Sequence, residues 1–155
     1  MKVPGGKPND VPDPDHVARF CHHQRGLIRE PETKRIQGLW PTAFELRADI
    51  EEKYLSMNHF EHFGLDVEVQ FTEMLKVLRS KFNKPKHAIA RLNAKTVRNC
   101  GGATHRIELK KRGQKHDPSY VHCTGLPLDN SDGNLLIELA KSWVEIREIA
   151  GIKAP

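Results

Sequence analysis

The segment DVEVQFTEMLKVLRSKF (66–82) carries the clearest folding signal in the chain. Its apolar residues recur at the three- and four-residue spacing that places them on one face of a helix. They are Val67, Phe71, Met74, Leu75, Leu78 and Phe82. Asp66 stands at the start and basic residues lie near the end, which suits the helix dipole. We predict an amphipathic helix over Asp66–Phe82, and such a helix needs an apolar surface to pack against.

Three strand-like runs follow this helix and supply that surface. They are Ala88–Arg98, Thr104–Lys111 and Ser119–Thr124. In the second run, His105, Ile107 and Leu109 point to one side, because successive side chains of a strand alternate. A turn containing Gly101 and Gly102 separates the first two runs. We therefore predict that these two runs form a hairpin with one basic face.

Toward the N-terminus, residues 1–14 predict an extended, proline-rich arm. Its four prolines remove backbone donors, and its composition, which includes a Gly-Gly pair, buries little surface. After the arm, the weak alternation of Asp15–Cys21 predicts a short strand. The polar run His22–Leu39 predicts a long loop or lid.

The remaining segments complete the predicted fold. Residues 41–54 fit either a helix that opens with a capping box or a strand at 43–47, and we favour the strand. Residues 56–63 predict a short helix and residues 131–150 a final helix, each with a serine as its N-cap. We expect a single α+β domain over residues 15–155. It has an antiparallel sheet of about four or five strands, with two main helices on one face.

Composition excludes several classes of protein. The chain of 155 residues is 37% hydrophobic and 29% charged, which is typical of a globular domain with a polar surface. Its apolar runs are shorter than the roughly 18 residues of a spanning helix, and its first residues lack the apolar core of a secretion signal. Three cysteines fit free thiols in a reducing compartment. We expect a cytoplasmic protein rather than a membrane protein, a collagen-like chain or a disulfide-stapled mini-protein.

Charge is segregated along the chain. Residues 76–115 hold thirteen basic residues and one acid, so the net charge of this segment is +12. Because the net charge of the whole chain is +5, the remaining residues carry a net charge of −7. Such a block attracts polyanions, of which nucleic acid is the commonest, although it also fits a solvated face balanced by the acidic remainder. Aromatic residues for base stacking are scarce here, which favours contacts to the phosphate backbone. The expected contact residues are Arg91, Lys95, Arg98, Arg106, Lys110, Lys111 and Arg112.

Two clusters of cysteine and histidine residues, whose sulfur and nitrogen atoms can bind zinc, make zinc the candidate cofactor. Cys21-His22-His23 and His122-Cys123 together offer the four ligands of a tetrahedral site. The candidate ligands are Cys21, His22, His122 and Cys123. Neither Cys-x-x-Cys nor His-x-x-x-His occurs, and adjacent residues of a strand point to opposite faces. Packing is therefore the alternative role of both cysteines.

Histidine and arginine also recur beside hydroxyl groups. A site that acts on phosphoesters needs a base with a pKa near neutrality and a cation for the developing phosphate charge. Arg19, His105, Arg106 and His122 are the candidates for such catalysis. Nine histidines make chance adjacency common, and no phosphate-binding loop, nucleophile elbow or zinc-protease motif is present.

Four stretches together resemble small uncharacterised bacterial proteins associated with mobile elements or defence regions. They are DHVARFC (15–21), AFELR (43–47), YLSMN (54–58) and GLP (125–127). The resemblance implies a bacterial, cytoplasmic origin and carries no catalytic residue across. We expect an accessory or binding module that contacts nucleic acid or another polyanion through residues 76–115. The alternatives are a small enzyme acting on phosphoesters or nucleotides and a protein–protein interaction subunit.

Overall fold

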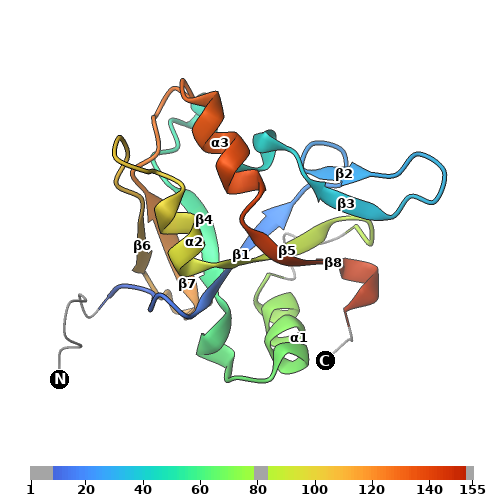
Figure 1. The fold of residues 1–155 in the computed structure, drawn as a ribbon. Coiled ribbons are helices and arrows are strands. Elements are labelled where there is room, and N and C mark those ends of the chain that lie inside the picture. The colour runs from blue at the N-terminus through green and yellow to red at the C-terminus, as the bar shows by residue number, and fades with distance from the viewer. Residues whose placement is uncertain (1–8, 79–83, 153–155) are drawn as a thin grey trace.

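The computed structural model describes residues 9–78 and 84–152, and its centre is a six-stranded antiparallel sheet (Figure 1). In spatial order the strands are β6 (Glu108–Lys111), β7 (Tyr120–Thr124), β4 (Leu55–His59), β1 (His16–Cys21), β5 (Ala88–Asn93) and β8 (Trp143–Glu148). The predicted α+β class with an antiparallel sheet is confirmed, although the sheet has more than the expected four or five strands. Strands β4 and β8 both lie in segments that were expected to be helical.

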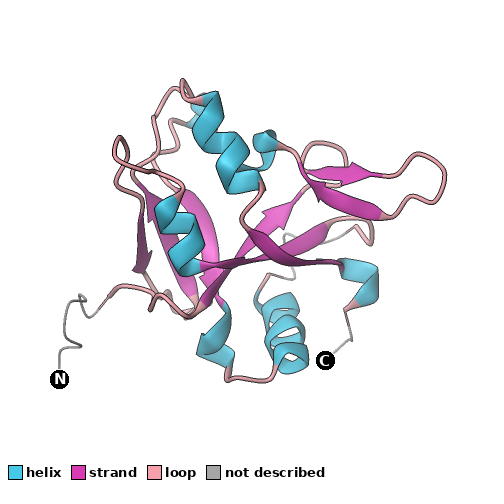
Figure 2. Ribbon diagram, in the orientation of Figure 1, coloured by secondary structure: helices cyan, strands magenta, loops and turns pink. Residues whose placement is uncertain are grey.

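Helices cover both faces of the sheet, so the expectation that two main helices share one face is wrong (Figure 2). They are α1 (Val67–Val77), α2 (Ala94–Asn99) and α3 (Gly133–Ala140). Phe71 of α1 belongs to the same apolar cluster as Ala18 of β1. Leu139 of α3 belongs to a second cluster with the neighbouring Val17. Because Val17 and Ala18 point to opposite faces of the strand, each face needs its own helical cover.

The predicted helix over Asp66–Phe82 is confirmed from Val67 to Val77. The Asp66 carboxylate caps it by accepting a hydrogen bond from the backbone N–H of Val69 at 3.1 Å. Residues 79–82 of the prediction lie outside the described residues.

The last predicted helix is wrong beyond Ala140. Asp132, rather than Ser131, caps α3 through the backbone N–H of Leu135 at 3.0 Å. The chain then turns into β8, which pairs with β5 from Glu148 opposite Ala88 onward. Pairing with a distant strand therefore outweighs the local helical spacing, as tertiary contacts commonly do.

The predicted hairpin of residues 88–98 with 104–111 does not form. Strand β5 ends at Asn93, whose side-chain oxygen accepts the backbone N–H of Thr96 at 3.1 Å and caps α2. Strand β6 begins only at Glu108 and lies at an edge of the sheet. Three strands separate it from β5, so the two basic runs lie on different parts of the molecule.

Residues 22–63 also differ from the prediction. They contain β2 (Leu27–Arg29), β3 (Ile36–Leu39), η1 (Pro41–Phe44), η2 (Ala48–Ile50), β4 and η3 (Phe60–Phe63). The expected loop is a hairpin in which buried Leu27 pairs with buried Leu39. In place of the favoured strand at 43–47, a 3₁₀ helix that Pro41 begins ends at Phe44, and residues 45–47 are a loop. Strand β4 replaces the expected helix because Leu55 and Met57 alternate into the core.

Strand β1 has unequal partners on its two sides, and this shapes the site. It pairs with β5 at six positions, from His16 opposite Asn93 to Cys21 opposite Ala88. It pairs with β4 at only two positions, Val17 and Ala18. The two strands then separate, and the sheet opens beside the second half of β1.

The described part of the predicted arm lies along the edge strand β6. The backbone N–H of Val11 donates to the carbonyl of Leu109 at 3.0 Å, and Lys111 donates to the carbonyl of Asn9 at 2.6 Å. Val11 is fully buried, so this part of the arm contributes one side chain to the core. Residues 1–8 lie outside the described residues.

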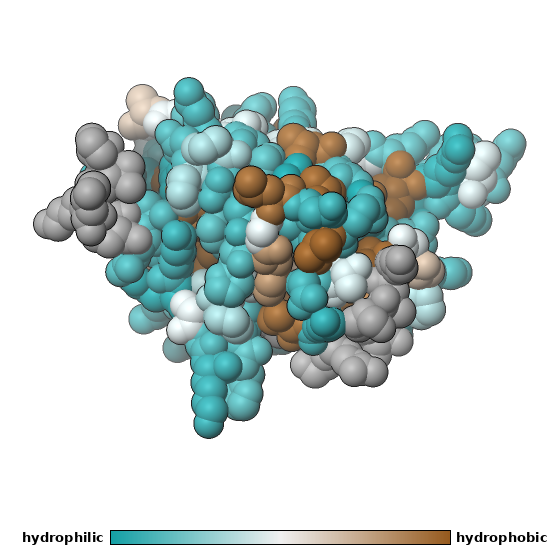
Figure 3. All heavy atoms as spheres, turned by 90° about the horizontal axis from the view of Figure 1, so that it is seen from below, coloured by the Kyte–Doolittle hydropathy of each residue, from teal (hydrophilic) through white to brown (hydrophobic). Residues whose placement is uncertain are grey.

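The side of the molecule that carries α1 is mostly hydrophilic, with apolar groups gathered near the middle of the view (Figure 3). Leu65 and Val69 are among the large apolar side chains that the structure leaves exposed. Within residues 9–78 and 84–152, every helix is too short or too polar to span a membrane.

Candidate functional site

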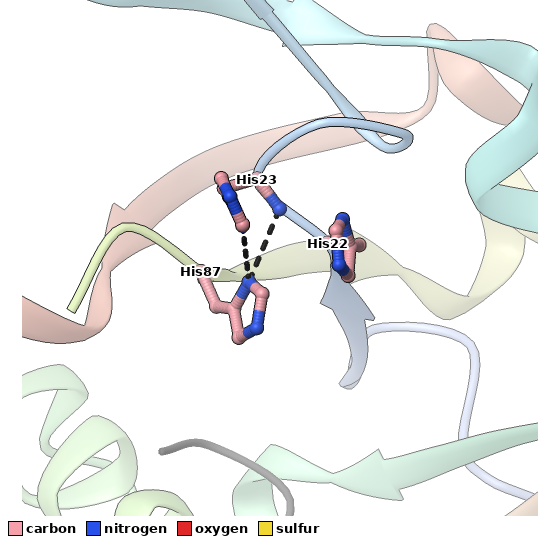
Figure 4. Close-up of side chains that lie close together, drawn as sticks. All are labelled: His22, His23 and His87. Carbon is pink, nitrogen blue, oxygen red and sulfur yellow. Dashed lines mark hydrogen bonds between the residues drawn. The ribbon is translucent and has the colours of Figure 1, made fainter. Parts of the chain in front are cut away.

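Three histidines meet where β1 ends and β5 begins. The last residue pair of these antiparallel strands is Cys21 opposite Ala88. His22 and His23 therefore follow β1 at the point where His87 precedes β5 (Figure 4). We call His22, His23 and His87 the histidine cluster. Only the pairing of the two strands brings them together, because more than sixty residues separate His23 from His87.

The imidazoles of the histidine cluster are closely packed. The Nδ1 atoms of His23 and His87 lie 3.1 Å apart, and Nδ1 of His87 also accepts the backbone N–H of His23 at 3.1 Å (Figure 4). Ring centroids are 4.7 to 4.8 Å apart in all three pairs. One nitrogen from each ring can be chosen so that all three lie within 4.8 Å of one another. The cluster thus offers three convergent nitrogen atoms.

His87 is the rigid member of the histidine cluster. It is 4% exposed, and its ring meets the edge of Phe20 at a centroid distance of 5.1 Å. Its backbone N–H donates to the carbonyl of Lys84 at 3.1 Å, and its carbonyl accepts the N–H of Ile149 at 2.8 Å. The position of this imidazole is therefore fixed by packing and by backbone hydrogen bonds on both sides.

Burial and neighbouring cations lower the pKa of each histidine in the cluster. Desolvation is the largest cause for all three, and Lys84 contributes in each case. Arg25 acts on His22, and Lys86 acts on His23. Arg25, Lys84 and Lys86 are exposed around the cluster, and we call them the cationic rim. The lowered pKa values favour neutral imidazoles, which can accept hydrogen bonds or bind a metal.

An open cavity of about 1290 Å³ borders the histidine cluster at His22. It extends along the opening between β1 and β4 and beneath η1. Its polar lining includes Arg19, Gln24, Thr42, Ser56, Asn58 and Asn130. Arg25 of the cationic rim also lines it, so the cavity and the rim meet at this residue.

Arg19 fills part of the opening between β1 and β4. Its Nε donates to the carbonyl of Ala43 at 2.8 Å, and its Nη1 donates to the carbonyl of Ser56 at 3.0 Å. Desolvation lowers the pKa of this guanidinium, and its two recorded acceptors are uncharged. The side chain therefore joins β1 to β4 and η1, and it brings a positive charge to the cavity wall.

The four residues considered for catalysis are not brought together. Arg19 lines the cavity, but His105, Arg106 and His122 are not among the residues that line it. Nε2 of His105 donates a hydrogen bond to the Asp132 carboxylate at 2.9 Å, beside the start of α3. Arg106 is exposed, and His122 stacks on Tyr54 with ring centroids 3.6 Å apart.

The four residues considered for zinc are also dispersed. His22 belongs to the histidine cluster, but Cys21 and Cys123 are fully buried in the core between the sheet and α3. Burial raises the pKa of both thiols to about 12, which suits packing residues. His122 points away from Cys123, because the two are neighbours on β7.

The residues considered for nucleic-acid contacts fall into two groups. Three are half-buried and form ion pairs with acids of the same chain: Arg91 with Glu61, Arg98 with Asp13, and Lys110 with Asp10 and Glu108. The others are exposed, and one of them, Arg106, also forms an ion pair, with Glu108 at 3.4 Å. They are Lys95, Arg106, Lys111 and Arg112.

Sequence analysis missed His87 as a site residue. The signal that could have found it is the register of two strands that were both predicted, Asp15–Cys21 and the run that begins at Ala88. An antiparallel pairing with Cys21 opposite Ala88 places His22 next to His87. The prediction instead paired the second run with Thr104–Lys111.

Comparisons with protein-family models, with curated proteins and with solved structures each found no match. The chemistry of the site therefore follows from its own geometry: three convergent imidazoles, a cationic rim and a polar cavity with a buried guanidinium in its wall.

Proposed function

We propose that this protein binds the phosphate backbone of nucleic acid, with the cationic rim as the contact surface. The observation that carries the proposal is the gathering of Arg25, Lys84 and Lys86 around the histidine cluster, beside an open cavity. Lys84 and Lys86 belong to the basic segment 76–115. Exposed cations that converge on one surface attract the closely spaced charges of a nucleic-acid backbone.

The distribution of ion pairs favours the cationic rim over the rest of the basic segment. Among the described residues, the ion pairs of the basic segment use Lys76, Arg91, Arg98, Arg106 and Lys110, and none uses a residue of the cationic rim. A cation already paired with a carboxylate must lose that partner to bind phosphate, whereas a free cation releases only solvent and counterions. The rim can therefore bind phosphate without breaking contacts that stabilise the fold.

A salt titration tests this proposal. Fluorescence anisotropy with labelled duplex and single-stranded oligonucleotides should show log affinity falling linearly with log salt. The double variant Lys84→Gln, Lys86→Gln removes two contacts, so the slope should decrease by about 1.8, at roughly 0.9 per phosphate contact on duplex DNA. The matched control, Lys95→Gln with Lys111→Gln, makes the same change in net charge at exposed positions on α2 and β6.

Each outcome of the titration has one meaning. A loss of slope confined to the rim variant supports the proposal. Equal losses in both variants would show contacts spread over the basic segment, and a loss confined to the control would place them away from the rim; either result would refute the rim as the contact surface. No binding by the wild-type chain at low salt would refute nucleic-acid binding and leave the rim as a docking surface for an acidic protein.

One observation favours a second candidate, a small enzyme acting on phosphoesters. Arg19 and His22 line the same cavity, so a cation and an imidazole face a shared space that could hold a small phosphoester. Hydrolysis of a chromogenic phosphodiester should then be lost in His22→Ala. This candidate would be eliminated if the wild-type chain showed no detectable turnover, or if His22→Ala turned the substrate over as fast as the wild type.

A further inference from the structure

We propose that His22, His23 and His87 bind a divalent transition-metal ion, with Zn²⁺ as the best fit. Borderline metals of this kind prefer imidazole nitrogen, and three protein ligands with one open position are the pattern of a reactive zinc site. Of this set, His22 and His23 were considered as zinc ligands from the sequence, together with Cys21, His122 and Cys123, and His87 was not. The metal site is measured without nucleic acid, so it stands or falls independently of the proposed function.

The distances between nitrogen atoms fit a metal ion. Two imidazole nitrogens at about 2.0–2.1 Å from a tetrahedral Zn²⁺ lie roughly 3.3 Å apart. The Nδ1 atoms of His23 and His87 are 3.1 Å apart and point toward each other (Figure 4). Without a metal, a proton must lie between these two nitrogens. A metal ion takes the place of this proton and also of the hydrogen bond that Nδ1 of His87 accepts from the backbone N–H of His23.

The third ligand is already close. A ring nitrogen of His22 lies within 4.8 Å of the other two ligand atoms. Nδ1 of His22 accepts the backbone N–H of Gln24 at 3.1 Å in an exposed turn. A rotation of the half-buried His22 ring that releases Gln24 completes a three-nitrogen site around the fixed His87.

The charges around the cluster specify the fourth ligand. Three neutral imidazoles leave the full charge of the metal in place, and the cationic rim adds further positive charge. An anionic fourth ligand offsets that charge. Because His22 lines the cavity, the open position of the metal adjoins a space that admits hydroxide or a phosphate oxygen. The phosphate alternative rests on the proposed function, whereas the metal site itself does not.

A second group of ligand-type residues does not compete with the histidine cluster. Asp15, His59 and Glu61 also approach one another. Their oxygen and nitrogen atoms are already used, since Asp15 binds His59 at 2.7 Å, and Glu61 binds His16 at 2.7 Å and Arg91 at 3.6 Å. This group is a hydrogen-bonded network that ties β1, β4 and β5 together.

Calorimetric titration of the metal-free full-length chain with ZnCl₂ tests the inference. The wild-type chain should bind one Zn²⁺, and His23→Ala should weaken binding by more than about 100-fold, the upper limit for loss of a mere supporting hydrogen bond. His116→Ala, at an exposed position outside the cluster, is the matched control and should bind as the wild type does. His22→Ala should weaken binding in the same way as His23→Ala.

Thermal unfolding separates a lost ligand from a damaged fold. A metal ion that binds only the folded chain stabilises it. The melting temperature of the wild type should therefore rise when Zn²⁺ is added at 100 times its dissociation constant. His23→Ala should melt near the metal-free wild type and should not respond to Zn²⁺. The inference is overturned if the wild type binds no zinc, or if His23→Ala and His116→Ala bind it equally well.

Discussion

Replacing Arg19 by leucine should destabilise the fold, because this side chain bridges the opening in the sheet. Its guanidinium donates to the carbonyls of Ala43 and Ser56, which belong to two other elements. A hydrogen bond from a charged donor contributes about 1.5–3 kcal/mol, and the open cavity lets water replace part of that contribution. We expect Arg19→Leu to lower the free energy of unfolding by about 2–4 kcal/mol.

Urea denaturation followed by circular dichroism measures this loss. The midpoint should fall while the m-value stays constant, since the surface exposed on unfolding hardly changes. For a chain of this length, the melting temperature should drop by between about 4 and 16 °C. Arg19→Lys keeps the charge and a single donor group, so its midpoint should lie between those of the wild type and Arg19→Leu.

Arg106→Leu is the control for this experiment. Arg106 is exposed, and its loss should change the free energy of unfolding by less than about 0.5 kcal/mol. If Arg19→Leu is no more destabilised than Arg106→Leu, the guanidinium does not hold β1 to β4, and the bridging role is wrong.

Two further predictions concern the core and a turn. Burial raises the pKa of Cys21 and Cys123 to about 12, whereas an unfolded thiol ionises near pH 8.5, so stability should decline as pH rises above about 9. Alkylation of native protein at neutral pH should therefore spare both thiols, and their rapid modification would contradict this. Gly125→Ala should lower the melting temperature more than Gly64→Ala. Both positions have positive φ, 94° and 95°, but only at Gly125 would a methyl group meet the carbonyl oxygen of Arg106, at 2.0 Å.

Local signals predicted some elements well. Helix α1 was found because an apolar stripe and a capping aspartate agree, and both act within a few residues of each other. Strand β7 (Tyr120–Thr124) was found because turn residues bound it on each side. Strand β8 was missed because Trp143 and Arg147 also fit the helical spacing that starts in α3. Only pairing with β5 favours a strand over a continued helix for these residues, and β5 lies more than fifty residues away in the sequence.

The residues of the candidate site likewise divide into those with a local sequence signal and those that depend on distant strand pairing. Arg19 and His22 could be singled out from the sequence because their residue types stand beside a predicted strand. His87 gave no local signal, since it follows Pro85 in a polar segment and gains its neighbours only through the register of β1 and β5. The pairing of Arg91 with Glu61, of Arg98 with Asp13 and of Lys110 with Asp10 gave no local signal either, because these acids come from distant parts of the chain.

The strand order has a consequence for how the chain folds as it is synthesised. Strand β1 emerges early, but its full-length partner is β5, and the edge strand β8 comes near the end of the described chain. Contacts between residues so far apart give a high contact order, which slows folding toward the millisecond-to-second range. Until β5 leaves the ribosome, β1 exposes an unpaired edge with an apolar residue on each face, which is a template for association with other chains. A nascent chain stalled before Ala88 should therefore bind chaperones, and one extended past Glu148 should not.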